Sequence, residues 1–346
     1  MELRPQTLDG YIGQDHIKES LSIAVNASRK RGDALDHTLL TGPSGIGKTT
    51  LALIIANMIG SECRIVNCAG LEEVAQIREI FEQVNPHDII FLDEVHRLPP
   101  RMQEFLYHPM EDNILEVKEE EFIDDAQEWE NELRNNPHIY PITNPLFSLP
   151  PKSKGIRKTG KTITSTLKLP PITIIGATTN AGGLAKPLRD RFENALILQA
   201  YSNEEMALIA EQKAKMLDMK ITKGACKNIA QRSRSTARIC VNYIRRCRDV
   251  ADVRDLDTID DNIVDKALDM LGVDKHGLTN VDLNYLQVLS ESARPQGINS
   301  LASQLGEDKS TLEEIVEPFL VQLKLINKTT RGRIITERGL DYLCQN

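Results

Sequence analysis

Short apolar runs that end in polar residues alternate with helical patterns along the first part of the chain. The runs lie at residues 37–40, 64–66, 88–93 and 172–177, and an apolar-periodic helix is predicted at 51–59. Such runs are typical of parallel strands that are buried on both faces and carry functional groups at their C-terminal ends. The alternation therefore predicts an α/β domain with a parallel sheet over residues 1–198.

The pattern changes twice after this domain. Residues 203–271 show helical periodicity with no strand-like alternation, which predicts a small helical-bundle domain at 199–273. Residues 274–346 form a third predicted domain, with helices at 283–291, 300–305 and 311–320 before two short apolar stretches at 324–326 and 333–336. Three helices followed by a β-hairpin indicate a winged helix.

One stretch interrupts the rhythm of the α/β domain. Between residues 116 and 132 there are nine acidic residues, whereas residues 152–168 carry six basic residues and no acidic one. A structureless stretch of this length inside a compact domain is usually functional or disordered. We expect an insertion or hairpin region at about 116–168.

Composition narrows the class of protein. Hydrophobic residues make up 40% and charged residues 27%, and the formal net charge is −8. A protein that coats DNA over its whole surface would be basic, so DNA contact is expected only at a local basic element. No run approaches the ~18 consecutive apolar residues of a membrane span, and no secretory signal is evident. We expect a cytoplasmic protein with no membrane contact.

The segment 42–49, GPSGIGKT, matches the phosphate-binding loop pattern between a predicted strand and a predicted helix. Its glycines let backbone N–H groups close around phosphate oxygens, and the helix N-terminus adds positive potential. Lys48 is predicted to reach the terminal phosphates of ATP, and the Thr49 hydroxyl to ligate Mg²⁺.

A second predicted strand ends in adjacent carboxylates, Asp93 and Glu94. Asp93 is expected near Thr49, where it would hold the magnesium shell, and Glu94 would polarise the attacking water. Alone this pattern is weak, but downstream of a phosphate-binding loop it indicates ATP hydrolysis as well as binding.

The whole chain resembles the RuvB family of bacterial Holliday-junction branch-migration ATPases, which belong to the AAA+ class. The stretches that carry the resemblance include LRPQTLDGYIGQ (3–14), IIFLDEVHRL (89–98), PPITIIGATTNAG (170–182), PLRDRFE (187–193), RSRSTARI (232–239) and EPFLVQLKLINKTTRGR (317–333). The resemblance implies an AAA+ ATPase core, a small helical lid and a C-terminal DNA-binding winged helix.

The resemblance also implies roles for single residues. Those implied to bind nucleotide are Leu3, Arg4, Tyr11 and Ile12 around the base, Gly45, Gly47, Lys48, Thr49 and Thr50 at the phosphates, and Glu111, Asp112, Asn113, Arg191, Tyr201 and Arg238. Thr179 matches sensor 1, which helps to orient the water, and Arg238 matches sensor 2 on the lid. Asn113 and Asn180 stand where the family usually has an aromatic residue and an arginine.

Arg191 matches the arginine finger that a subunit donates to its neighbour's γ-phosphate. A finger acting in trans requires head-to-tail assembly, which closes into a ring, here expected to be a hexamer. Residues 321–340 carry a local net charge of +4, and Lys328, Arg331 and Arg333 are the expected DNA contacts. In the family an arginine is usual at the position of Lys328.

The family has a β-hairpin between Asp93–Glu94 and Thr179 that docks on RuvA, a junction-binding partner. Here the interval 112–170 is longer by roughly 35–40 residues than typical domain loops allow. The basic half, 152–171, is expected to retain the hairpin, and the acidic half to be an addition. The addition is interpreted either as a solvated insertion or as a changed partner interface.

The predicted function is an ATP-hydrolysing DNA helicase or translocase that promotes Holliday-junction branch migration in DNA recombination and repair. One alternative is a clamp-loader-like or partner-remodelling AAA+ ATPase. The other is a nucleotide-regulated winged-helix DNA-binding protein with little turnover, against which Glu94, Thr179, Arg191 and Arg238 count because a pure binder needs none of them.

Overall fold

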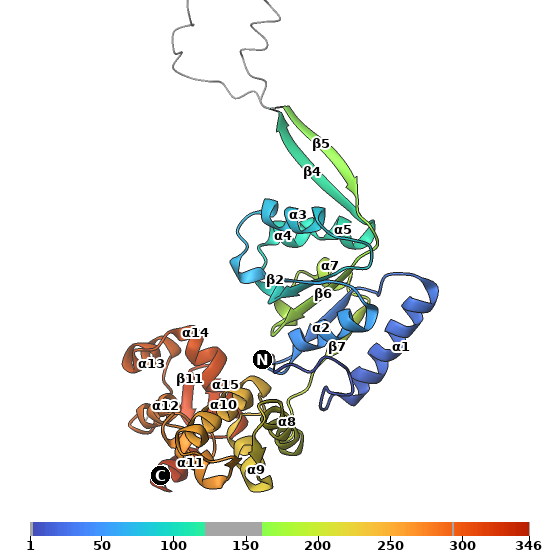
Figure 1. The fold of residues 1–346 in the computed structure, drawn as a ribbon. Helices are drawn as coiled ribbons and strands as arrows, with labels where there is room; N and C mark the ends of the chain where they lie inside the picture. Colours follow the sequence, from blue (N-terminus) through green and yellow to red (C-terminus); the bar gives the residue numbers. More distant parts are fainter. Residues whose placement is uncertain (1–2, 122–160, 293, 346) are drawn as a thin grey trace, which may run out of the picture.

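A computed structural model describes residues 3–121, 161–292 and 294–345 (Figure 1). Its largest sheet has the order β2-β3-β6-β1-β7, and all pairings within it are parallel. The strands are β1 (Thr38–Thr41), β2 (Cys63–Asn67), β3 (Ile89–Asp93), β6 (Thr173–Thr178) and β7 (Asn194–Ile197). The predicted parallel α/β core is confirmed, and β7 is a strand that the apolar pattern did not reveal.

Strand β3 shows why the central strands appear in the sequence as continuous runs of apolar residues. Ile89 and Phe91 belong to the hydrophobic cluster that includes helices α1 (Asp15–Arg31) and α2 (Lys48–Ile59). Ile90 and Leu92 belong to the cluster on the other face, with α3 (Val74–Glu82) and α4 (Pro100–Phe105). Both faces are covered, so every residue of β3 before Asp93 is buried.

Short elements complete this domain. They are η1 (Cys68–Gly70), η2 (Val95–Arg97), α5 (Tyr107–Glu111), η3 (Ala181–Gly183) and α7 (Lys186–Arg189). The antiparallel strands β4 (Ile114–Glu121) and β5 (Lys161–Lys168) project from the domain as a two-stranded ribbon (Figure 1).

This ribbon corrects one expectation. The basic half of the insertion was expected to retain the hairpin and the acidic half to be an addition. The structure instead pairs β5 with β4, which includes the start of the acidic half, with Ile114 opposite Lys168 and Glu121 opposite Lys161. Pairing between strands that lie far apart in the sequence is a tertiary contact, which periodicity within either half could not reveal. The rest of the predicted addition, residues 122–160, lies outside the described residues.

The second domain is the predicted helical lid. Its helices are α8 (Asn203–Met216), α9 (Lys223–Arg232), α10 (Ala237–Val253) and α11 (Asp261–Asp269). A capping box of Ser202 and Glu205 begins α8. The pattern did not reveal two short strands within this domain, β8 (Lys220–Ile221) and β9 (Thr258–Ile259), which pair in parallel. Two residues per strand are too few to show an alternating pattern.

The third domain is the predicted winged helix. Its elements are α12 (Asn280–Ser290), α13 (Ile298–Leu305), α14 (Lys309–Thr311), the π-turn η4 (Leu312–Val316), α15 (Glu317–Gln322), β10 (Ile326–Thr329), β11 (Gly332–Ile335) and α16 (Glu337–Gln345). Pro318 has no N–H to donate to the preceding turn, which accounts for the π-turn inside the predicted third helix. Helix α16 was not predicted. None of the described helices is long and apolar enough to cross a membrane.

Candidate nucleotide-binding site

The phosphate-binding loop joins β1 to α2 and depends on glycine at two positions. Gly45 and Gly47 have φ angles of 74° and 104°, in the left-handed region that side chains disfavour. A Cβ atom at Gly47 would lie 2.7 Å from the hydroxyl oxygen of Tyr11. Lys48 begins α2, so the first N–H groups of the helix have no intrahelical acceptor and can bind an anion.

Two buried tyrosines from other segments form hydrogen bonds with this loop. The hydroxyls of Tyr11 and Tyr201 donate to the Ile46 carbonyl at 3.2 and 2.8 Å. Burial raises the pKa of both phenols, so both stay protonated donors. Tyr201 immediately precedes the cap of α8, so the loop is tied to the N-terminal segment and to the lid at a single carbonyl.

The charged residues that were predicted around the phosphates lie together. The Lys48 ammonium is buried and donates to the carbonyls of Gly42 and Pro43 at 2.8 and 2.9 Å. Burial lowers the Lys48 pKa, and the carboxylates of Glu94 and Asp93 oppose that shift. Burial, followed by the charge of Glu94, raises the pKa of Asp93. Opposite charges placed in one partly buried site favour binding of a ligand that carries both phosphate and a cation.

Glu94 turns away from the end of β3 with a positive φ of 53°. The Thr179 hydroxyl donates to the Glu94 carboxylate at 3.4 Å, and the His96 Nδ1 atom lies 3.3 Å from the same oxygen. His96 Nδ1 is also 3.0 Å from the hydroxyl of Thr178, a fully buried residue at the end of β6. Glu94 is therefore held between two neighbouring strands, which suits a residue that must position a water molecule.

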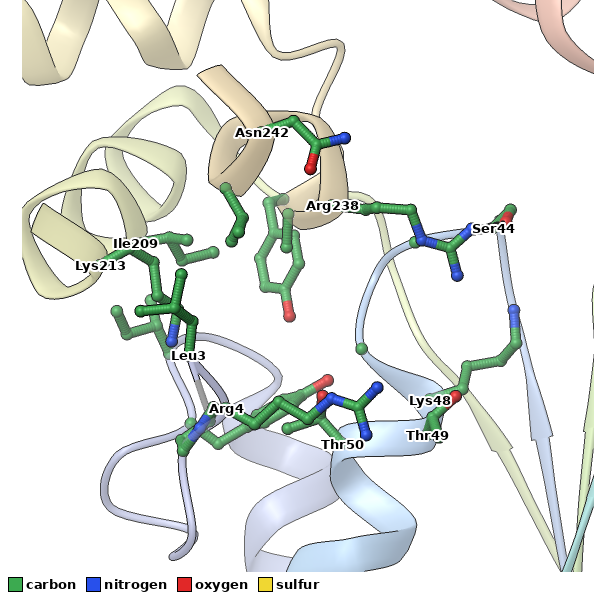
Figure 2. A pocket seen from close by; sticks show the side chains of 18 of the residues that line it. Leu3, Arg4, Ser44, Lys48, Thr49, Thr50, Ile209, Lys213, Arg238 and Asn242 are labelled. Carbon is green, nitrogen blue, oxygen red and sulfur yellow. Dashed lines mark hydrogen bonds between the residues drawn. The ribbon is translucent and has the colours of Figure 1, made fainter. Parts of the chain in front are cut away.

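A cleft of 810 Å³ connects these groups to the lid. Predicted residues that line it are Leu3, Arg4, Tyr11, Ile12, Gly45, Gly47, Lys48, Thr49, Thr50, Asp93, Glu94, Tyr201 and Arg238. Leu3 and Ile209 lie at one side of the cleft, and Lys48, Ser44 and Arg238 at the other (Figure 2). The apolar side suits a base and the side with Lys48 suits phosphates, so the cleft has the polarity of a nucleoside triphosphate.

Comparisons with known proteins agree with this geometry along the chain. The Holliday junction DNA helicase RuvB P-loop domain matches residues 3–127, the RuvB AAA lid domain 201–274, and the RuvB C-terminal winged helix domain 275–344. The Holliday junction branch migration complex subunit RuvB of Oenococcus oeni is 39% identical over 99% of this chain and 91% of its own length. The chain belongs to the RuvB family.

Other relatives give the same result. RuvB of Prochlorococcus marinus is 40% identical over 99% of this chain and 87% of its own length. The solved structure of the Thermotoga maritima RuvB Holliday junction branch migration motor has a TM-score of 0.77 at 33% identity, and the match covers 99% of this chain and 98% of that one. The AAA+ core, lid and winged helix of the RuvB family are therefore present.

Five residues predicted for the nucleotide site do not line the cleft of their own chain: Thr179, which donates to Glu94 from just beyond β6, and a group of four around Arg191. The Arg191 guanidinium lies 2.5 Å from the Glu111 carboxylate and 4.3 Å from the ring centroid of Tyr107, and it donates to the Pro187 carbonyl at 2.9 Å. Asp112 and Asn113 follow Glu111 directly. The four residues predicted to contact nucleotide that stand apart are Glu111, Asp112, Asn113 and Arg191. Glu111, Asp112 and Asn113 are consecutive and Arg191 contacts Glu111, so the four lie together outside the cleft.

Other residues of the cleft were missed from the sequence. They are chiefly Gln212, Lys213, Asn242 and Arg245, on the lid helices. One signal was visible, because Lys213 continues the apolar spacing of Met206, Ile209 and Ala210 on α8. A lysine on the buried face of a helix is unusual and could have been singled out.

The wing differs from the expectation for Arg333. Its guanidinium donates to the carboxylate of the fully buried Glu317 at 2.7 Å, and the Tyr285 hydroxyl donates to the same carboxylate at 2.8 Å. Lys328 is also ion-paired with Glu317, although its side chain is 44% exposed. Arg333 is thus directed into the winged domain, whereas Arg331 is exposed at the hairpin turn.

Proposed function

We propose that this chain is the ATP-driven motor that moves the branch point of Holliday-junction DNA during recombination and repair. The observation that carries the proposal is the cleft in which the phosphate-binding loop, Asp93, Glu94 and the lid residue Arg238 converge. Its relatives are named as subunits of the Holliday junction branch migration complex. We take residues 1–198 as the ATPase domain, 199–273 as the lid and 274–346 as the DNA-binding domain.

The hydrolytic step uses groups that already lie around the cleft. Thr49 and Asp93 line the cleft and offer oxygen ligands, which Mg²⁺ prefers. A bound Mg²⁺ would neutralise the charge that develops on the phosphates. Lys48 binds the terminal phosphates. Glu94 polarises the water, with its carboxylate oriented by Thr179. Such positioning and electrostatic stabilisation account for most of the catalysis in phosphoryl transfer.

Arg238 couples the lid to the bound nucleotide. Its backbone N–H donates to the Gly45 carbonyl at 3.2 Å, and its guanidinium lies 3.5 Å from the Ser44 hydroxyl. The helix that begins at Ala237 therefore rests on the phosphate-binding loop. A terminal phosphate attracts this guanidinium and its loss releases it, so hydrolysis changes the angle of the lid.

We infer that the active form is a ring. The resemblance to the RuvB family implies six subunits. Support comes from Arg191 and Glu111, which lie outside the cleft of their own chain and next to each other. Pairing with Glu111 and stacking on Tyr107 hold the guanidinium in one orientation before assembly. A neighbour's cleft would receive Arg191, and hydrolysis would depend on assembly.

The wing is the proposed DNA contact, and the β4–β5 ribbon the proposed docking site for a RuvA-like junction-binding protein. Arg331, at the exposed turn between β10 and β11, can reach backbone phosphates without reading sequence. The ribbon projects away from the lid and the winged domain, which leaves it accessible to a partner (Figure 1). We place the protein in the cytoplasm, where bacterial DNA lies.

A branch-migration assay tests the proposal. A labelled four-way junction is incubated with the chain, Mg²⁺ and ATP, with and without a RuvA protein. We expect dissociation into duplex products that requires ATP and is abolished by Lys48→Ala, while Lys30→Ala, an exposed-lysine control, retains activity. ATP turnover without any strand movement under either condition would favour a partner-remodelling ATPase instead.

A further inference from the structure

Lys213 lies on the buried face of α8, where a charged residue is out of place. The neighbouring residues on this face, Met206, Ile209, Ala210 and Ala214, are all buried, and Lys213 itself is 5% exposed. It nevertheless lines the nucleotide cleft. Burial of a lysine side chain costs free energy unless its ammonium group finds acceptors.

The acceptors around this ammonium are incomplete. Its Nζ atom donates to the Gln212 side-chain oxygen at 2.8 Å and contacts the Met216 sulfur, a weak acceptor, at 3.7 Å. No carboxylate is ion-paired with it among the described residues. An ammonium has three N–H donors, so at least one remains for a ligand. Burial lowers the pKa of Lys213, in agreement with the lack of a counter-ion.

Gln212 fixes the position of this donor. Its side-chain nitrogen donates to the Gly10 carbonyl at 2.7 Å, while its oxygen accepts from Lys213. Gly10 belongs to the N-terminal segment that also brings Tyr11 to the phosphate-binding loop. The lid and the N-terminal segment are thus joined at the point where Lys213 enters the cleft, and the ammonium is pre-organised.

The position of Lys213 within the cleft indicates what it can contact. Figure 2 shows it beside Leu3 and Ile209, on the side opposite Lys48 and Thr49. A triphosphate bound at Lys48 would place its base among these apolar side chains. Lys213 is then a cationic donor at the edge of the base, too far along the cleft to serve the phosphates.

We propose that Lys213 reads the base, donating a hydrogen bond to an acceptor on the purine edge, so that the site takes 6-oxopurine nucleoside triphosphates as well as ATP. Guanine and hypoxanthine present two adjacent acceptors, O6 and N7, which suit lysine, whereas adenine presents N7 beside an amino donor. This inference rests on the proposed function, because it assumes that the cleft binds a nucleoside triphosphate.

The test measures nucleotide binding without hydrolysis, by displacement of a fluorescent ATP analogue from the full chain with Mg²⁺. For the unchanged chain we expect ATP, GTP and ITP to bind within about ten-fold of one another, since each offers at least one acceptor to Lys213. Lys213→Met should weaken GTP and ITP by about ten-fold or more and weaken ATP less, because a charge-assisted bond is lost.

Lys215→Met is the matched control, because Lys215 is an exposed lysine on the same helix. It should leave all three affinities unchanged. Equal weakening of ATP, GTP and ITP by Lys213→Met would show a structural role and overturn the inference. If Lys213→Met fails to fold, the affinities of the unchanged chain still test the inference. An affinity for GTP and ITP more than a hundred-fold lower than that for ATP overturns it. Failure of the unchanged chain to bind any nucleotide would refute the proposed function instead.

Discussion

The guanidinium of Arg234, in the lid, is ion-paired with the carboxylate of Asp282, on the first helix of the winged domain. Asp282 is fully buried and the Arg234 side chain is 10% exposed. Arg234 also donates to the Gly277 carbonyl at 2.9 Å and lies 4.5 Å from the ring centroid of Phe319. Three residues separate Arg234 from Arg238, so the segment that lines the cleft is anchored directly to the winged domain.

Removal of this anchor should destabilise the protein strongly. Arg234→Ala leaves the Asp282 carboxylate buried without a counter-ion, held among the described residues only by the N–H and hydroxyl of Thr279. Loss of one member of a buried ion pair costs about 3–5 kcal/mol of unfolding free energy. Urea denaturation followed by circular dichroism measures it. The control is Arg246→Ala, because the ion pair of Arg246 with Asp249 is about half exposed and contributes about 0–1 kcal/mol. Equal effects of the two variants would contradict the structural role of Arg234.

An arginine finger that acts in trans predicts complementation between inactive subunits. Glu94→Gln and Arg191→Ala should each abolish most ATP hydrolysis, but mixtures should recover some. Each recovered interface pairs an intact Glu94 site with an intact Arg191 from a Glu94→Gln neighbour. Turnover is measured by phosphate release across mixing ratios.

A second mixture controls for this result. Glu94→Gln combined with Lys48→Ala should recover nothing, since both defects lie in the same cleft and every site lacks one group. Absence of recovery at every ratio of Glu94→Gln and Arg191→Ala would argue against a finger donated by a neighbour.

The two wing arginines should behave differently. Arg331→Ala should weaken duplex binding and lower its salt dependence by about one charge, with stability unchanged within about 0.5 kcal/mol. Arg333→Ala should lower the unfolding free energy by about 1–3 kcal/mol, because the buried Glu317 carboxylate loses a donor. Fluorescence anisotropy with labelled DNA and urea denaturation separate the effects. If Arg333→Ala weakened DNA binding and left the unfolding free energy unchanged, Arg333 would face the DNA.

The winged domain should lose stability in acid. Burial tends to raise the Glu317 pKa, but hydrogen bonds from Arg333, Lys328 and Tyr285 hold it below its ordinary value of 4.5. A carboxyl group whose pKa is lower in the folded state stabilises the fold above its unfolded pKa. That stabilisation is present at neutral pH and is lost as the pH falls below about 4.5 through the folded value.

Comparison of two variants isolates this contribution. The stability difference between the unchanged chain and Glu317→Gln, from urea denaturation at several pH values, should be largest near neutral pH and shrink below about pH 4.5. Glu314→Gln is the matched control because the Glu314 side chain is 66% exposed. A pH-independent difference for Glu317→Gln would exclude the proposed linkage.

Local patterns were sufficient for the parts of this protein that depend on neighbouring residues. The phosphate-binding loop from Gly42 to Thr49, the strand that ends at Asp93 and the helices of the lid each follow from periodicity or fixed spacing within a short segment. The placement of Leu3 and Arg238 in one cleft was inferred only through resemblance to a family, because nothing local joins them.

Tertiary structure decided what depends on distant segments. It paired the acidic strand β4 with the basic strand β5, directed Arg333 toward Glu317, placed Arg191 outside its own cleft and brought Lys213 into it. Each is a contact between segments that only packing brings together, and its free energy depends on the burial and charge of both partners. The sequence by itself determined the phosphate-binding loop and the three kinds of domain, whereas the fold determined which charges face inward, which lie outside the cleft and which line it.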